Sequence, residues 1–204
     1  MLELIKAGGF VMWPLLLCSI IAVAIIGERL IALQRRRVAP VTAIKAAREW
    51  GRRGEISGEQ IKTLEEGSPL GRILAVGLMN RRHPRAIVRE AIEDTGRHVA
   101  VELDRYLDAL GTIAAIAPFL GLLGTVLGMI HMFSGLGQQG VGDPAILASG
   151  IAQALTTTAT GLGIAIPSLI FYRYLRARVN ALLTDMEREA LRLVEILKGE
   201  REAV

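Results

Sequence analysis

The sequence predicts an all-α membrane protein with three transmembrane helices, the second and third of which continue as long cytoplasmic helices. The chain of 204 residues is 22% charged, yet it has three long stretches without charge, bounded by Lys6 and Glu28, Asp108 and Asp143, and Asp143 and Arg173. Each stretch exceeds the roughly 20 residues that a helix needs to cross a bilayer. The flanking sequences have helical periodicity and show no strand pattern.

The first element, residues 1–33, is interpreted as the N-terminus and the first transmembrane helix. A cleaved signal peptide is the alternative, but the apolar core is long, the basic N-terminal region is weak and no small-residue cleavage site is present. Glu28 and Arg29 then form an anchor at the end of a retained helix. The only cysteine, Cys18, lies inside this helix, so the sequence predicts no disulfide, no metal site and no cofactor.

Residues 34–107 are predicted to be a cytoplasmic segment of short helices. One ends near Gly51, a capping box from Ser57 to Gln60 begins the next, and Ser68 caps a helix that starts with proline. After a break that ends at Pro84, a helix is expected to continue without interruption into the second transmembrane helix. Its apolar positions are Val88, Ile92, Thr95, Val99, Leu103, Tyr106 and Leu110.

The second transmembrane helix is placed at residues 108–133 and the third at 145–172, with a glycine-rich loop at 134–144 between them. Residues 173–204 are expected to form a cytoplasmic C-terminal helix that packs on the helix after Pro84; an ordinary solvated tail is the alternative. The apolar seam of this helix has heptad-like spacing. It consists of Val179, Leu183, Met186, Ala190, Leu193 and Leu197.

Basic residues indicate the orientation. Arginines follow the first helix, precede the second and follow the third, whereas the 134–144 loop has neither lysine nor arginine. The positive-inside rule places the middle segment and the C-terminus in the cytoplasm, and the N-terminus and the loop on the other side. The net charge of +4 is modest and no basic cluster alternates with aromatic residues, so nucleic-acid binding is not expected.

Polar residues on the third transmembrane helix are the strongest functional signal. Because an unpaired polar group in lipid costs free energy, and an interhelical hydrogen bond recovers only about 0.6–2 kcal/mol, such a group of side chains favours a polar pore or binding surface. Hydrogen bonding between helices is the alternative. One face contains Ser149, Gln153, Thr156, Thr157 and Thr160, and Thr158 lies on the adjacent face.

Small residues on the second transmembrane helix predict close helix packing. Gly121, Gly124 and Gly128 include a GxxxG match, with Thr125 among them, and Gly161 on the third helix is given the same packing role. No Asp, Glu, Lys or Arg lies deep within the three helices, and no catalytic set of residues is visible, so an enzyme is not expected. A proton path would need a titratable group from a partner.

Three stretches resemble the ExbB/TolQ/MotA family of bacterial proton-channel stators, and the resemblance extends over nearly the whole chain. They are GERL at residues 27–30, FLGLLGTVLGMIHMF at 119–133 and GIAQALTTTATGLGIAIP at 150–167. The three spans and the short length resemble ExbB, and next TolQ, rather than the four-span MotA.

The resemblance implies a homopentamer in the inner membrane, with its N-terminus in the periplasm and membrane lipid around it. The second and third helices would line a central pore that holds a dimer of a single-span ExbD- or TolR-like partner, whose aspartate carries protons. The work would pass to TonB-dependent outer-membrane transport, or through a TolA-like protein to the Tol–Pal system. A non-conducting membrane scaffold is the alternative from a different class, and a membrane enzyme is a distant third.

The resemblance assigns the pore threonines to Thr125 and Thr158. Many relatives have glutamate where this chain has Gln153, and a neutral amide cannot hold a proton. Helical periodicity instead selects Gln153, Thr157 and Thr160 as the pore-lining face. Both surfaces are therefore candidates for the proton path.

Overall fold

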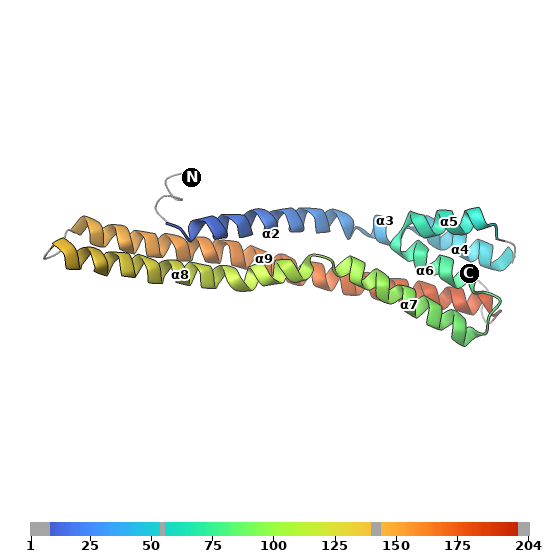
Figure 1. Ribbon diagram of the computed structural model, residues 1–204. Coiled ribbons are helices and arrows are strands. Elements are labelled where there is room, and N and C mark those ends of the chain that lie inside the picture. Colours follow the sequence, from blue (N-terminus) through green and yellow to red (C-terminus); the bar gives the residue numbers. More distant parts are fainter. Residues whose placement is uncertain (1–8, 54–55, 140–143, 200–204) are drawn as a thin grey trace. The chain divides into compact units, whose positions relative to one another are not determined.

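The computed structural model describes residues 9–53, 56–139 and 144–199, and the regular elements in this part of the chain are all α-helices (Figure 1). This confirms the all-α fold class. The helices are α2 Met12–Ala32, α3 Arg35–Val38, α4 Val41–Arg53, α5 Gly58–Gly67, α6 Pro69–Met79, α7 Arg85–Asp104, α8 Leu107–Gln139 and α9 Pro144–Leu197.

Three helical stretches are long and apolar enough to cross a membrane, judged by length and composition. They are Met12–Ala32, Arg85–Ser134 and Leu147–Leu197. The 21 residues of α2 extend about 31 Å at 1.5 Å per residue, close to the roughly 30 Å thickness of a bilayer's hydrocarbon core. The three charge-free stretches of the sequence therefore correspond to three candidate membrane helices.

The described residues form two compact units. The first contains residues 9–28, 106–139 and 144–174, and the second contains residues 29–53, 56–105 and 175–199. In the first unit α8 and α9 lie side by side and antiparallel, since Gly111 lies next to Tyr172 and Gly128 lies next to Gly150. Val11, directly before α2, and Met12 and Leu15 in its first turn join an apolar cluster. Ala117 and Ala165 complete this cluster.

In the second unit the C-terminal half of α9 packs on α4, α6 and α7. The predicted seam is confirmed at four of its six residues, since Val179, Met186, Ala190 and Leu193 are each at most 1% exposed. The other two, Leu183 and Leu197, are half-buried. Three ion pairs also join α9 to neighbouring helices. Glu189 pairs with Arg48 at 2.7 Å, Asp185 with Arg35 at 3.3 Å, and Arg176 with Asp104 at 3.5 Å.

The predicted helix starts in the middle segment are also confirmed. Ser57 and Gln60 form the capping box of α5, and the Ser68 hydroxyl accepts a hydrogen bond from the Gly71 amide, with Pro69 in the first turn of α6. One helix end is later than predicted, because α4 continues past Gly51 to Arg53. The Gly51 Cα faces Leu197 and Leu193 side chains, so tertiary packing holds the last turn together.

The prediction of an uninterrupted helix from Pro84 into the membrane is wrong, because Arg105 and Tyr106 interrupt it. The helix α7 ends at Asp104, Tyr106 adopts a left-handed φ of 64°, and α8 begins at Leu107. The break deprives the last carbonyls of α7 of their helical N–H partners. The buried Arg29 side chain supplies a donor there, since its Nη1 donates to the carbonyl oxygen of Leu103 at 3.3 Å and to that of Glu102 at 3.5 Å. The Glu102 oxygen also accepts the Arg105 backbone N–H at 3.3 Å.

The predicted loop at 134–144 is also wrong in part, because α8 continues through residues 134–139. This stretch has no proline, and a glycine inside a helix costs only about 1 kcal/mol relative to alanine. Pro144 occupies the first position of α9. The rest of the loop at 140–143, the N-terminal residues 1–8 and the C-terminal residues 200–204 lie outside the described residues.

Candidate functional site

Thr125 and Thr158 meet at one backbone carbonyl. The Thr158 hydroxyl on α9 donates to the Gly121 carbonyl oxygen on α8 at 3.2 Å. In an α-helix this same oxygen accepts the backbone N–H of the residue four positions later, which is Thr125. The Thr125 hydroxyl donates to the Leu122 carbonyl oxygen at 2.6 Å and is partly exposed. The Thr158 hydroxyl and the Thr125 backbone N–H are therefore both directed at the Gly121 carbonyl, whereas the Thr125 hydroxyl is bonded within α8.

Thr157 occupies the interior of the same contact. It is 0% exposed, and its hydroxyl hydrogen-bonds the carbonyl oxygens of Gln153 and Ala154 in its own helix, both at 3.0 Å. Gly124 lies directly opposite, where a Cβ would approach the Thr157 Cγ2 within 2.9 Å. Thr157 thus satisfies its own polar group internally and fills the space that Gly124 leaves.

Gln153 faces the beginning of α2. Its side-chain amide contacts the backbone at Gly9, and a Cβ at that position would lie 3.3 Å from the Gln153 Cδ. Gly9 also has a φ of +66°, which favours glycine. The side chain is therefore packed against another helix start of the same chain, on a different side of α9 from the contact between Thr158 and Gly121.

Thr160 is half-buried, and its hydroxyl donates to the Thr156 carbonyl oxygen at 2.8 Å. The predicted packing glycines lie along the α8–α9 contact. A Cβ at Gly161 would lie 2.6 Å from the Ala117 carbonyl oxygen, one at Gly128 would lie 2.9 Å from the Gly150 carbonyl oxygen, and one at Gly121 would lie 3.1 Å from the Thr157 carbonyl oxygen. The helices approach at backbone distance, so their hydroxyls can reach each other's carbonyls.

The threonine hydroxyls and the Gln153 amide at this site can form hydrogen bonds but cannot bind or release a proton near neutral pH. Hydroxyls donate and accept, amides do the same, and neither ionises near neutral pH. Between Asp108 and Arg173 the only Asp, Glu, Lys or Arg is Asp143, outside the two charge-free stretches. Among the described residues no three His, Cys, Asp or Glu side chains are grouped as metal ligands. The site can orient water or a guest carboxyl group, but it contains no acid of its own.

Comparison with known proteins identifies the family. The model of the MotA/TolQ/ExbB proton channel family matches residues 65–188, which contain the whole α8–α9 contact. The chain belongs to this family.

Relatives of this family member include proteins named ExbB and TolQ. A putative biopolymer transport protein, ExbB-like 1, of Synechocystis is 35% identical over 171 residues, covering 82% of this chain and 67% of the relative. The biopolymer transport protein ExbB of Aquifex aeolicus is 35% identical over 136 residues, covering 63% and 91%. The Tol-Pal system protein TolQ of Haemophilus influenzae is 33% identical over 178 residues, covering 76% and 75%.

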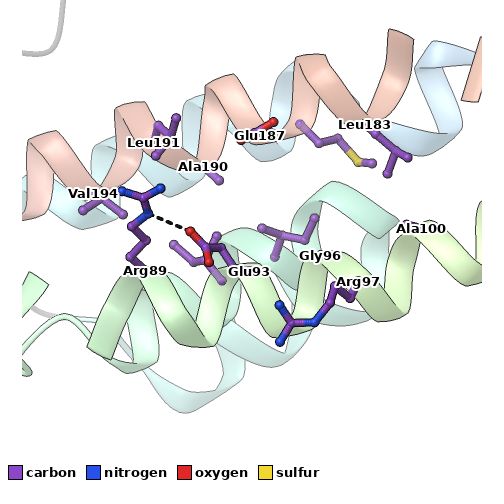
Figure 2. A pocket seen from close by; sticks show the side chains of 13 residues that line it. Arg89, Glu93, Gly96, Arg97, Ala100, Leu183, Glu187, Ala190, Leu191 and Val194 are labelled. Atoms are coloured by element: carbon purple, nitrogen blue, oxygen red, sulfur yellow. Dashed lines mark hydrogen bonds and ion pairs between the residues drawn. The ribbon is translucent and has the colours of Figure 1, made fainter. Parts of the chain in front are cut away.

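This family member also has a cavity of about 340 Å³ in its second unit, between α6, α7 and α9 (Figure 2). Figure 2 shows Arg89 joined to Glu93 on the α7 side, a contact of 2.6 Å. Gly96 lies beside the cavity, and a Cβ there would meet no atom within 4 Å. The cavity therefore lies where small residues such as Gly96, Ala100 and Ala190 leave space between α7 and α9.

Two features of this MotA/TolQ/ExbB member were missed by reasoning from the sequence. The contact of Arg29 with the end of α7 joins residues 73 and 74 positions apart, and Arg29 looked like an ordinary interfacial anchor. The cavity near Gly96 was also missed. A glycine in the middle of a charged helix was the available signal for it, because glycine weakens a helix unless packing or function requires it.

Proposed function

We propose that this chain is the proton-channel and stator subunit of a rotary motor driven by the proton-motive force. In this proposal it is a homopentamer of the bacterial inner membrane with a periplasmic N-terminus and a cytoplasmic C-terminus. An ExbD-like single-span dimer occupies the pore, and the motor energises TonB-dependent outer-membrane transport. Membership of the proton channel family supports the channel class.

The meeting of Thr125 and Thr158 at the Gly121 carbonyl is the observation that supports a proton path at this place. A partner carboxyl group that moves along α8 and α9 would leave an apolar wall and reach hydroxyls at this point. Burial in an apolar environment favours the neutral acid, whereas donors beside the group favour the carboxylate. The same carboxyl group would therefore bind a proton at one position and release it at the other.

The energy for this cycle comes from the membrane field. Each elementary charge that crosses the membrane releases about 2.3 kcal/mol per 100 mV. In this proposal Thr125 and Thr158 lie on the proton path, whereas Thr157, Gln153 and Thr160 hold the helices that form it. The internal hydrogen bonds of Thr157 and Thr160 and the contact of Gln153 with Gly9 support this division.

The test is proton flux into proteoliposomes that contain this chain together with an ExbD-like single-span protein that has an aspartate in its membrane helix. The variant Thr125→Val/Thr158→Val should lower partner-dependent flux at least tenfold, because valine keeps the volume but removes the hydroxyl. Thr112→Val is a matched control, since its exposed hydroxyl on α8 bonds only the Asp108 carbonyl at 2.8 Å. Flux that is unchanged in the double variant would exclude this path.

Size-exclusion chromatography and the helical circular dichroism of the double variant separate a lost path from a lost assembly. Thr125→Ser/Thr158→Ser should retain flux, because serine restores both hydroxyls. If the wild-type pair shows no flux above protein-free liposomes, the chain is the non-conducting scaffold instead.

A TolQ-like role in the Tol–Pal envelope system is the second candidate, favoured by the 33% identity to the TolQ of Haemophilus influenzae. Complementation separates the two pathways. A TonB-linked subunit should restore TonB-dependent uptake in a host that lacks its own ExbB-type protein. A Tol–Pal subunit should instead restore detergent resistance in a host that lacks its TolQ-type protein.

A further inference from the structure

Three consecutive arginines form a fixed, outward-facing group immediately after the first candidate membrane helix. They belong to the one-turn helix α3, Arg35–Val38. Its last residue and the next, Val38 and Ala39, are 1% and 6% exposed, so the apolar end of the turn is anchored in the second unit. The arginine side chains are exposed as a result.

Only one of these guanidinium groups is paired within the described part of the chain. Arg35 contacts Asp185 on α9 at 3.3 Å. The guanidinium groups of Arg36 and Arg37 have no hydrogen bond or ion pair with the described residues. Two neighbouring guanidinium groups are thus left without an anion, and this group binds phosphate through a planar fork of N–H donors.

The depth of these arginines in the membrane follows from α2. The apolar surface of α2 remains exposed up to its last turn, where Leu30 is 40% and Ile31 is 49% exposed. The helix ends at Ala32, and α3 begins three residues later. Arg36 and Arg37 therefore follow the apolar surface of α2 by only a few residues along the chain. Basic residues directly after a membrane helix are expected at the level of the lipid headgroups.

A further exposed arginine extends the positive patch. Arg178 precedes Asp185 by seven residues on α9, so the two lie on one face of the helix, two turns apart. Arg35 contacts Asp185, which places α3 on this same face. No described residue pairs with Arg178 either. The patch thus carries three unpaired guanidinium groups in the second unit.

We infer that Arg36 and Arg37 form a binding site for the phosphate headgroups of anionic membrane lipids. This inference goes beyond the proposed proton-channel function and does not depend on it. The lipid headgroup is chosen over free phosphate because the arginines directly follow a lipid-facing helix. A bound anionic headgroup would hold the end of α2 at a fixed depth and would select phosphatidylglycerol-type lipids over zwitterionic ones.

The test measures lipid binding to the purified full-length chain in a neutral detergent, by native mass spectrometry during titration with phosphatidylglycerol or phosphatidylcholine. Wild type should bind phosphatidylglycerol more tightly than phosphatidylcholine. An arginine near an anionic surface contributes about 1 kcal/mol, or about fivefold in affinity. Arg36→Gln/Arg37→Gln should therefore weaken phosphatidylglycerol binding about 25-fold and leave phosphatidylcholine binding unchanged.

The matched control is Arg53→Gln/Arg82→Gln, which removes the same charge far from α3. Gly51 packs on Leu197, and the Lys198 ammonium donates to the Arg81 carbonyl, so both control positions lie close in sequence to residues that contact the C-terminal end of α9. Leu197 is 12 residues, or about 18 Å, beyond Asp185 along the helix. The control should bind phosphatidylglycerol like wild type.

Several results would overturn the inference. One is equal phosphatidylglycerol affinity in wild type and Arg36→Gln/Arg37→Gln, and another is an equal loss in the control variant. A third is competition by inorganic phosphate at the concentration of the lipid, which would indicate a free-anion site. If the glutamine variant does not fold, Arg36→Lys/Arg37→Lys and the salt dependence of wild type decide: the lysine variant should keep the preference, and salt should weaken it.

Discussion

Replacing Gly161 by alanine tests whether α8 and α9 depend on backbone contact. The Cβ that this substitution adds would lie 2.6 Å from the Ala117 carbonyl oxygen and 3.1 Å from the Gly121 Cα. Both are backbone atoms of α8, so no side chain can rotate away and the helices must separate. Gly163, two residues later on α9, is the matched control, because its Cβ would meet no atom within 4 Å.

The magnitude follows from two opposing terms. Inserting a methyl group into a well-packed contact typically costs about 1–3 kcal/mol. Alanine gains up to about 1 kcal/mol over glycine in a helix interior, and this gain is common to both positions. Gly161→Ala should therefore be less stable than Gly163→Ala by about 1–3 kcal/mol, with Gly163→Ala at or above the wild type.

The assay is unfolding of the purified protein by sodium dodecyl sulfate in mixed micelles, followed by circular dichroism. The measured quantity is the difference in unfolding free energy between the two alanine variants, since helix propensity cancels in it. Equal stability of Gly161→Ala and Gly163→Ala would refute the reasoning, because it would show that α8 and α9 do not approach closely at Gly161.

Three further changes can be measured by the same unfolding assay. Gly9→Ala should lower the free energy of unfolding by about 1–3 kcal/mol, because φ is +66° and the Gln153 amide occupies the space that the added Cβ would need. In a Gln153→Ala background the clash with the amide should disappear. Only the backbone strain of about 1–2 kcal/mol should then remain. Arg29→Gln should lower the free energy of unfolding by about 1–3 kcal/mol, because the Leu103 carbonyl loses its donor. Amide hydrogen exchange near the end of α7 should also become faster. Unchanged exchange there would contradict the role of Arg29 in holding this helix end. Gly96→Ala should stabilise the protein by up to about 1 kcal/mol, because alanine favours the helix and its Cβ would meet no atom within 4 Å. A loss of stability would mean that the fold requires the cavity to stay open at this residue.

Local patterns in the sequence predicted much of the fold. The charge-free stretches correspond to the candidate membrane helices, because the length of an apolar helix is set by bilayer thickness and can be counted from sequence. The capping box at Ser57 and the Ser68 cap formed where predicted, since a cap involves only residues three positions apart. Val179, Met186, Ala190 and Leu193 of the predicted seam are buried because spacings of three and four place side chains on one face of a helix.

The break at Tyr106 could not be predicted in this way. Nothing in the sequence near Tyr106 requires a left-handed residue. The helix end that results is tolerated because Arg29, more than 70 positions away, donates to the Leu103 carbonyl. The helical wheel also placed Gln153, Thr157 and Thr160 on one face, but a wheel does not show which neighbour each side chain meets.

By itself, then, the sequence determined the helices, their membrane character and the absence of an intramembrane acid, because these depend on composition and local periodicity. Only the tertiary structure decided the partner of each polar residue. It buried Thr157 against Gly124, turned Gln153 toward Gly9 and brought Thr158 to the carbonyl shared with Thr125. The physical reason is the close antiparallel approach of α8 and α9, which is a property of two helices together and of neither alone.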